Sequence, residues 1–476
     1  MRGGMGAATA VVVLVLVSVS GCTPDSGPGR ASASTTARSA SPSDSGRAGA
    51  PCPPGPGRIA PDPDRPRVIL RFDVSADLGT VRGTEDVRFT PDLPISEVVF
   101  RLTANGPTAA RQGTSVRVSR AEADGHAGGT YQRAGAAAGT QGGLLTLPLG
   151  RRVPAGHVVT ARVEFTLTLG RGGFERFGHG RSVAWWGTGQ PLLAWERGVG
   201  WHREPLLDFL GESATSETAR LDLTVTAPTA DTVLSSGTQD APRPAGPGRR
   251  SWHAAAGTAR DVSVAVGRLN TATAVDGGTR ITVGAVDRHD LRRLADGVRS
   301  ALDSLRVRFG PFPYPALNVT LLPFGGGGIE YPGSILLLGS DRTTVVHEVA
   351  HQWFYGMVGD SQARDPWLDE AFATYAEQLV DGRPTPSRNV LAASGRVDSP
   401  TVAFAGDERR YVRIVYGKGA AALRAARDAA GPARFDAAVR CYLDTEAWRI
   451  ARPADLVRAL AGLPRALAVL RRAGAV

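Results

Sequence analysis

Hydrophobic and polar residues alternate along the first half of the chain in a pattern typical of β-strands. Residues 162–169 (RVEFTLTL) and 221–226 (LDLTVT) carry an apolar side chain at every second position. Period two places one face of a strand on a core and the other in water. Similar short apolar runs, separated by Gly, Pro and Asp turns, occur at Val68–Val74, Val98–Leu102 and Val262–Val266. We therefore predict an antiparallel β domain over residues 67–270.

After Asp287 the hydrophobic period becomes that of a helix. Apolar residues from Leu291 to Leu305 recur at three- and four-residue spacing, and Gly310-Pro311 ends the run. Short apolar strands follow at Val319–Leu322 and Ile335–Leu338, and helical patterns fill most of the remainder. The predicted fold class is multidomain α+β, with the β domain followed by a mostly helical domain over residues 271–476.

The amino terminus predicts export. Arg2 precedes an apolar stretch from Ala7 to Val19 and a small-residue site, which is typical of a secretory signal peptide over residues 1–21. The stretch is shorter than the roughly 20 apolar residues that a membrane span needs. Val19-Ser20-Gly21-Cys22 resembles a bacterial lipobox, and this implies cleavage before Cys22, lipidation of its thiol and anchoring to the outer face of the cytoplasmic membrane. The alternative is an ordinary signal peptide and a secreted protein.

A tether is predicted between the signal peptide and the β domain, over residues 22–66. From Thr23 to Pro66 the only large apolar residue is Ile59, so this Ser-, Pro- and Gly-rich segment cannot bury enough area to fold. If Cys22 is lipidated, Cys52 and Cys441 remain as an even pair in an oxidising compartment. The two could form a disulfide or remain free thiols.

Composition excludes several function classes. The chain is 42% hydrophobic and 21% charged, which excludes a wholly disordered chain and a polytopic membrane protein. The formal charge of +10 is carried by scattered arginines, since Lys418 is the only lysine. A nucleic-acid-binding protein would gather such charge on one element, so we predict no nucleic-acid partner.

The candidate chemistry begins with an HExxH pattern, His347-Glu348-Val349-Ala350-His351. On a helix, which Asp341 or Thr343 can cap, positions i and i+4 share one face, so both imidazoles can bind a single ion. Glu348 then lies beside the ion, where it can act as general base toward water.

A catalytic zinc site needs a third protein ligand and one open position. The histidine of metzincins would fall on Met357, which excludes that class. Eighteen residues separate His351 from Glu370, which lies at the start of a segment that Asp365-Pro366 can begin as a helix. We therefore predict one Zn²⁺ per chain, bound by His347, His351 and Glu370.

Together these motifs resemble the aminopeptidase N family of gluzincin zinc metallopeptidases, in a short bacterial lipoprotein form. The segment Trp367–Glu377 (WLDEAFATYAE) matches the family's third-ligand helix, and Gly327–Tyr331 (GGIEY) is similar to its GxMEN exopeptidase signature. Tyr416–Gly419 (YGKG) is similar to its YxKG segment. The resemblance implies a thermolysin-like catalytic domain. Ile329 and Tyr331 depart from the usual Met and Asn, which affects the expected specificity pocket.

The resemblance also implies roles for the remaining residues. Glu330, with Gly327 and Gly328 allowing the peptide backbone to approach, would bind the free ammonium of a substrate. Tyr416 would donate its hydroxyl to the oxyanion formed during hydrolysis, as a catalytic residue beside Glu348. Many relatives continue into a helical domain that covers the site, so a more open cleft, or a partner that closes it, is expected.

The predicted function is that of a zinc aminopeptidase, which hydrolyses the first peptide bond of peptides outside the cytoplasmic membrane. One alternative is a zinc endopeptidase or another zinc hydrolase with an open cleft. A second alternative is a non-catalytic binding protein that retains the fold.

Overall fold

The computed structural model describes residues 57–173, 175–180, 182–209, 215–287, 289–323, 326–384 and 387–476. The predicted signal peptide, Cys22 and Cys52 lie outside the described residues. Within them, no helix combines the length and apolarity that crossing a membrane requires. Cys441, on helix α8 (Pro432–Thr445), is disulfide-bonded.

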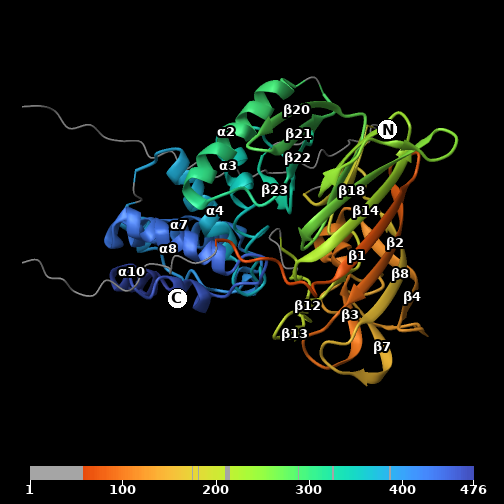
Figure 1. The fold of residues 1–476 in the computed structure, drawn as a ribbon, viewed down its shortest axis with the longest axis horizontal. Helices are drawn as coiled ribbons and strands as arrows, with labels where there is room; N and C mark the ends of the chain where they lie inside the picture. Colours follow the sequence, from red (N-terminus) through yellow and green to blue (C-terminus); the bar gives the residue numbers. More distant parts are fainter. Residues whose placement is uncertain are drawn as a thin grey trace, which may run out of the picture.

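A nine-stranded sheet forms one side of the first half of the chain (Figure 1). Neighbouring strands β1 and β14 pair in parallel, with Leu70 opposite Leu223, whereas the other pairs of this sheet are antiparallel. The prediction of a purely antiparallel domain therefore misses this one pair, because alternation along a strand carries no information on its direction. The order is β16 (Thr238–Gln239), β18 (Arg249–Ala259), β14 (Ala219–Pro228), β1 (Arg67–Val74), β2 (Thr80–Phe89), β8 (Val159–Thr168), β4 (Ser115–Ala123) and β5 (His126–Ala127), with β17 (Arg243–Pro244) beside β18.

Two four-stranded sheets accompany the large sheet. One contains β11 (Leu192–Leu193), β3 (Ile95–Arg101), β7 (Leu144–Val153) and β6 (Thr130–Gln132), and the other β15 (Thr232–Ser235), β19 (Ser263–Gly267), β10 (Val183–Gly187) and β9 (Phe177–His179). The buried ring of Trp186 packs edge-on against Phe72, with centroids 5.4 Å apart. The short elements η1 (Thr103–Asn105) and α1 (Pro107–Arg111) follow β3, and β12 (Trp195–Glu196) pairs with β13 (Gly200–Trp201) as a separate hairpin.

A five-stranded sheet opens the second half. Its order is β20 (Asn270–Asp276), β21 (Thr279–Ala285), β22 (Ala316–Leu321), β24 (Ser334–Leu337) and β23 (Gly328–Tyr331). Helix α2 (Leu291–Phe309) buries the apolar side that its periodicity predicts, including Leu294, Val298 and Leu302. The Asp290 carboxylate caps its first turn by accepting from the Arg293 amide.

Helices complete the second half and lie on the side of the molecule away from the large sheet (Figure 1). Phe354, after the HExxH segment, stacks on Phe372, with ring centroids 4.6 Å apart, in the core that joins the helices to the five-stranded sheet. In chain order the elements are α3 (Arg342–Ala350), α4 (Trp367–Val380), α5 (Arg388–Leu391), η2 (Thr401–Phe404), α6 (Glu408–Tyr411), the π-helix η3 (Val412–Lys418), α7 (Gly419–Ala430), α8, α9 (Pro453–Ala459) and α10 (Pro464–Ala473).

Residues 57–66, which composition assigned to the tether, contact both halves of the molecule. The end of the segment lies against the β-rich half, where the Pro66 carbonyl accepts from the Arg220 amide (2.7 Å), and Ile59 lies against the helical half. The Ile59 amide donates to the Asp444 carbonyl (3.0 Å), and the Trp448 indole donates to the Ile59 carbonyl (3.1 Å). Residues 57–66 thus make defined contacts with the folded body, and the boundary of the tether at residue 66 stays a prediction. Hydrogen bonds to residues distant in sequence and the packing of Ile59 against the helical core hold this segment, and composition reports neither.

Candidate metal centre and catalytic site

Helix α3 presents both histidines of the HExxH pattern toward helix α4. The Asp341 carboxylate caps α3 by accepting from the Thr344 amide at 3.0 Å. Val345, Val346 and Val349 are buried in the core, so the remaining face carries His347 and His351. Helix α4 begins at Trp367, directly after Pro366. Its first turn carries Glu370, whose side chain faces the two histidines.

His347, His351 and Glu370 converge as three ligands of a tetrahedral ion would. Oε2 of Glu370 lies 3.3 Å from Nε2 of His347 and 3.4 Å from Nε2 of His351. A tetrahedron with metal–ligand bonds of about 2.0–2.1 Å has edges of roughly 3.3–3.4 Å, so these separations fit a single Zn²⁺. The N₂O donor set is that of catalytic zinc sites with a fourth, open position.

Two carboxylates that the sequence did not reveal contact Nδ1 of these imidazoles, the ring nitrogen that does not face Glu370. Oε2 of Glu377 lies 3.5 Å from Nδ1 of His347, and the Asp369 carboxylate contacts Nδ1 of His351. A carboxylate on Nδ1 fixes the tautomer and leaves Nε2 free to bind a metal. Asp369, Glu370 and Glu377 all lie on α4, so the acidic positions of WLDEAFATYAE were the signal that could have revealed these partners.

Glu348 is buried beside the metal ligands, and Gly328 makes room for it. A Cβ on Gly328 would lie 2.6 Å from the Glu348 carboxyl carbon. Oε2 of Glu348 has no hydrogen-bond partner among the described residues. Burial raises the pKa of Glu348, together with the negative charges of Glu370 and Asp369. A carboxylate with a raised pKa is a stronger base toward water.

Glu330 lies on edge strand β23 and points toward the same site. One oxygen of Glu330 lies within 4.8 Å of atoms of Glu348 and His351. Glu330 is only 5% exposed, and its Oε1 has no hydrogen-bond partner in the described part of the chain. Burial raises the pKa of Glu330 well above its usual value, and nearby carboxylates add to the effect.

The two residues that depart from the GxMEN signature face away from Glu330. Ile329 and Tyr331 alternate with Glu330 on β23 and pack into a core shared with strand β10. A Cβ on Gly187 would lie only 1.8 Å from the Tyr331 hydroxyl oxygen, so glycine is required there. The Tyr331 hydroxyl accepts from Nη1 of Arg176 at 3.2 Å. These departures therefore alter the contact between the two halves of the molecule instead of the face that carries Glu330.

Gly327 adopts a backbone conformation that favours glycine, with φ +86°. Its carbonyl accepts from the amides of Leu338 (2.9 Å) and Gly339 (3.1 Å). Apart from its chain neighbours, no atom of the described residues lies within 4 Å of where its Cβ would be, so the space beside Gly327 is open on this account. The assignment of Gly327 and Gly328 to substrate binding stays a prediction, and the structure gives Gly328 a second reason to be glycine.

Tyr416 lies in π-helix η3 and stacks on His347, one of the three candidate metal ligands. Its ring is parallel to that of His347, with 4° between the planes and 5.9 Å between centroids. Burial and the negative charge of Glu370 raise the pKa of Tyr416 well above its usual value, so the hydroxyl stays protonated and can donate. Lys418, at the end of η3, donates to the carbonyls of Ala393 (2.8 Å) and Gly395 (2.7 Å), which gives the only lysine a structural role.

The structure thus gathers His347, His351, Glu370, Glu348, Glu330 and Tyr416 at one place. A metal site, a buried base, an unpartnered carboxylate and a phenol donor together can activate water, hold a cation and stabilise an oxyanion. The catalytic roles of these residues stay predictions, and Cys22 lies outside the described residues.

Comparison with known proteins points to one family. Residues 339–469 match the model of the peptidase family M1 domain. The chain is 31% identical over 179 residues to the leucyl aminopeptidase of Saccharolobus solfataricus, covering 31% of this chain and 23% of that protein. It is 28% identical over 196 residues to the tricorn protease-interacting factor F2 of Thermoplasma acidophilum, covering 34% and 25%. The matched regions span about a quarter of these curated relatives.

Solved structures agree over most of the chain. The M1 zinc metallopeptidase of Deinococcus radiodurans superposes with a TM-score of 0.64 at 19% identity, covering 88% of this chain and 96% of that one. A mutant of that protein bound to a Tyr-Ser-Ala substrate gives a TM-score of 0.64 at 20% identity, covering 87% and 94%. These matches show that the α+β fold, with its β-rich first half and helical second half, is that of M1 metallopeptidases.

Proposed function

We propose that this chain, which carries a peptidase family M1 domain, is a zinc-dependent aminopeptidase that removes the first residue of peptides. The observation that carries the proposal is the buried carboxylate of Glu330, with one oxygen unpartnered among the described residues, beside the three converging metal ligands. A substrate cut at an internal bond would bring no ammonium to this point for Glu330 to bind. A peptide amine is mostly protonated near neutral pH, because its unperturbed pKa is about 7.7–8.0.

His347, His351 and Glu370 would hold the zinc ion, which when bound acts as a Lewis acid toward water and the scissile carbonyl. Glu348 would accept the proton of the attacking water and then deliver it to the leaving amine. Gly328 allows Glu348 to occupy this position, since any larger residue would displace its carboxyl group. Asp369 and Glu377 would keep both imidazoles in the metal-binding tautomer.

Glu330 and Tyr416 would orient the substrate and stabilise the charge that develops on it. The ammonium would be bound by charge-assisted hydrogen bonds to Glu330, which sets the first peptide bond over the metal. The Tyr416 hydroxyl would donate to the carbonyl oxygen as it becomes negative.

The relatives support this substrate class. One curated relative is a leucyl aminopeptidase, and structural neighbours hold a Tyr-Ser-Ala substrate, L-arginine or L-tryptophan. Peptides with a free amino terminus are therefore the proposed substrates.

Metal analysis combined with activity tests the proposal. The purified chain should contain one zinc, lose hydrolysis of unblocked aminoacyl substrates in a chelator, and regain it on addition of Zn²⁺. His351→Ala should contain no zinc, whereas His157→Ala, at an exposed turn, should behave as wild type. Full zinc content in His351→Ala would contradict the site, and activity unaffected by metal removal would contradict the mechanism.

We further propose that the protein acts on the outer face of the cytoplasmic membrane, anchored through lipidated Cys22. The lipobox-like sequence supports this, and so does the disulfide at Cys441, since such bonds persist in oxidising compartments. Cys22→Ser should move the protein from the membrane fraction to the soluble exported fraction. Unchanged membrane association, or a mature amino terminus without acyl mass, would contradict this anchor.

A further inference from the structure

The chain segment that connects His351 to Glu370 lies in the seam between the β-rich half and the helical half. At its centre, the Gly359 amide donates to the Arg449 carbonyl (2.9 Å), and the Ala451 amide donates to the Gly359 carbonyl (2.7 Å). Nη1 of Arg260, which follows strand β18, donates to the Ser216 carbonyl (2.9 Å). Its guanidinium also covers Gly359 so closely that a Cβ there would lie 2.3 Å from it.

The first end of this connection is held at Tyr355. Tyr355 is buried and has φ +96°, which is rare for a bulky side chain and persists only where the surroundings enforce it. Its hydroxyl donates to Oδ2 of Asp261 at 2.8 Å, and the Thr188 hydroxyl donates to the same oxygen at 2.9 Å. Both partners belong to the β-rich half. The carbonyl of the preceding residue, Phe354, lies 3.3 Å from Nδ1 of His351, so this turn touches a metal ligand.

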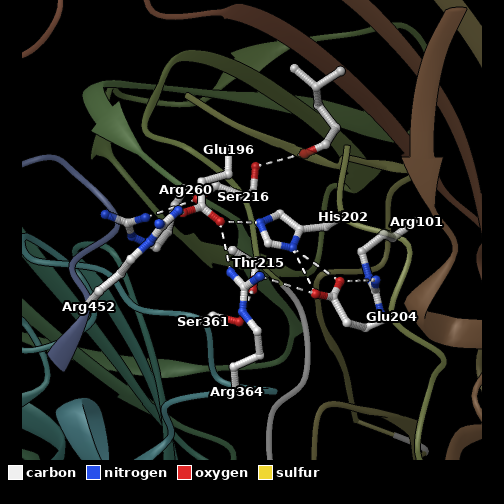
Figure 2. A network of polar contacts seen from close by, with 11 residues as sticks. Arg101, Glu196, His202, Glu204, Thr215, Ser216, Arg260, Ser361, Arg364 and Arg452 are labelled. Carbon is white, nitrogen blue, oxygen red and sulfur yellow. Dashed lines mark hydrogen bonds and ion pairs between the residues drawn. The ribbon is translucent and has the colours of Figure 1, made fainter. Parts of the chain in front are cut away.

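The second end is held at Arg364, two residues before the proline that starts α4. Nη2 of Arg364 donates to Oε2 of Glu196 at 2.9 Å (Figure 2). Glu196 lies on strand β12 and is almost completely buried. Its other oxygen accepts from Arg452 at 2.7 Å, and His202, which bridges to Glu204, contacts Oε2 at 2.5 Å. Figure 2 shows Arg364 and Arg452 reaching Glu196 from the helical half, while His202 approaches from the β-rich half.

Glu196 and Asp261 are buried carboxylates, whereas the side chains of Arg364 and Arg452 are 40% and 51% exposed. Burying a carboxylate is an inefficient way to gain stability. Removing ions from water costs free energy that their mutual attraction offsets only when the geometry is good. Such groups are best attested where they fix the registry of one element on another. Here they hold the two ends of the segment that connects the metal ligands His351 and Glu370.

We propose that Asp261 and Glu196 are positioning residues of the metal centre: from the β-rich half they fix both ends of the connection between His351 and Glu370. The inference rests on the proposed zinc site. It means that the β-rich half, which contributes no metal ligand of the proposed set, nevertheless determines how firmly the third ligand is held. Loss of either contact should loosen residues 355–366 and let zinc leave faster from a protein that is still folded.

Zinc release to an excess of a chromogenic chelator, followed in the full-length holoprotein, tests this directly. Tyr355→Phe and Glu196→Gln each remove one partner while keeping the shape of the side chain, and Arg364→Gln removes the guanidinium by shortening the side chain. We expect each to release zinc at least about 3-fold faster, below the roughly 10- to 100-fold cost of losing a direct partner of a ligand. The matched control is Asp436→Asn, which breaks the ion pair of Arg427 and Asp436 between α7 and α8.

Two further readouts separate positioning from general stabilisation. Hydrogen exchange should become faster in residues 355–366 of the three variants, and remain as in wild type in the control. Glu196→Gln combined with Arg364→Gln should release zinc no faster than the faster single variant, because both act through one contact. Should Glu196→Gln fail to fold, Tyr355→Phe and Arg364→Gln carry the same test.

The outcomes are distinguishable. Lower thermal stability with zinc release and exchange at the rates of the control would overturn the proposal, since the contacts would then merely join the two halves. If the wild-type chain bound no zinc at all, the proposed function would fail instead. Unchanged hydrogen exchange in residues 355–366 of the variants would then overturn the positioning claim separately.

Discussion

The phenol ring of Tyr416 lies parallel to the imidazole of His347, with 4° between their planes and 5.9 Å between their centroids. This places the candidate oxyanion donor against a metal ligand. Tyr416 comes from the π-helix η3, and such wide turns occur frequently at functional sites. The position of the hydroxyl is therefore tied both to the metal ligands and to an unusual backbone turn.

Tyr416→Phe should lower kcat while leaving zinc content unchanged. Loss of one preorganised oxyanion donor costs about 2.7–4 kcal/mol, or roughly 10²- to 10³-fold in rate. KM should change little, because the interaction forms mainly in the transition state. Steady-state kinetics and metal analysis check this. Tyr131→Phe is the control, because Tyr131 is exposed on strand β6, in the other half of the chain. A Tyr416→Phe enzyme within a few-fold of wild type would remove the oxyanion role.

Gly328→Ala should impair catalysis through Glu348. The added methyl group would meet the Glu348 carboxyl carbon at 2.6 Å, and a buried carboxylate has little room to move. A general base typically contributes roughly 10²- to 10⁴-fold to the rate, so we expect its displacement to lower kcat by about 10-fold or more. Gly257→Ala, where no atom lies within 4 Å of the new Cβ, is the matched control. Equal activity of the two variants would show that Glu348 does not need this space.

Asp369→Asn and Glu377→Gln should weaken zinc binding. Each carboxylate holds Nδ1 of one histidine, and loss of such a partner typically costs 10- to 100-fold in metal affinity. Competition with a chelator of known affinity measures the effect. Glu377→Gln also loses its ion pair with Arg383, so Arg383→Gln separates that contribution. Wild-type affinity in both carboxylate variants would exclude the proposed support.

The pH dependence of stability should report His202. Although burial opposes its charge, the hydrogen bonds that the His202 ring donates to the carboxylates of Glu196 and Glu204 raise the pKa of His202 above its ordinary value. A group whose pKa is raised on folding stabilises the protein below its unfolded pKa of about 6.5, and this contribution is lost as pH rises through the folded pKa. The charged groups around it are Glu196, Glu204, Arg101, Arg364 and Arg452.

The unfolding free energies of wild type and His202→Gln should therefore differ more at about pH 6 than at about pH 8, above the unfolded pKa of about 6.5. Denaturant titrations at both pH values measure the difference. His157→Gln controls for loss of an exposed imidazole. A difference that stays constant or grows with pH would contradict a charged His202.

Much of the fold could be predicted because the patterns were local. Period-two alternation located β8 and β14, and helical spacing located α2 up to Gly310. The parallel pairing of β1 with β14 could not be predicted, since the alternation of a strand does not reveal its partner's direction. The contacts of residues 57–66 were missed for a related reason: they are hydrogen bonds and packing contacts with residues distant in sequence.

In the candidate site, too, the features set by local sequence could be predicted and those set by distant residues could not. The sequence predicts the spacing of His347 and His351 and the start of a helix before Glu370. These three residues converge in the structure. The partners of the imidazoles, the space that Gly328 leaves for Glu348, and the packing of Tyr331 over Gly187 depend on three-dimensional neighbours. Tyr355 could not be singled out either, because a positive φ at a tyrosine has no sequence signature.

The central claim, an aminopeptidase that recognises a free amine through Glu330, is tested most directly by one ratio. It is the ratio of kcat/KM for an unblocked tripeptide to that for the same peptide with an acetylated amino terminus. We predict a large preference for the unblocked peptide in wild type. In Glu330→Gln this preference should fall by roughly 10- to 150-fold, the value of a charge-assisted hydrogen bond of about 1.5–3 kcal/mol. Equal cleavage of both peptides by the wild-type enzyme would contradict the account.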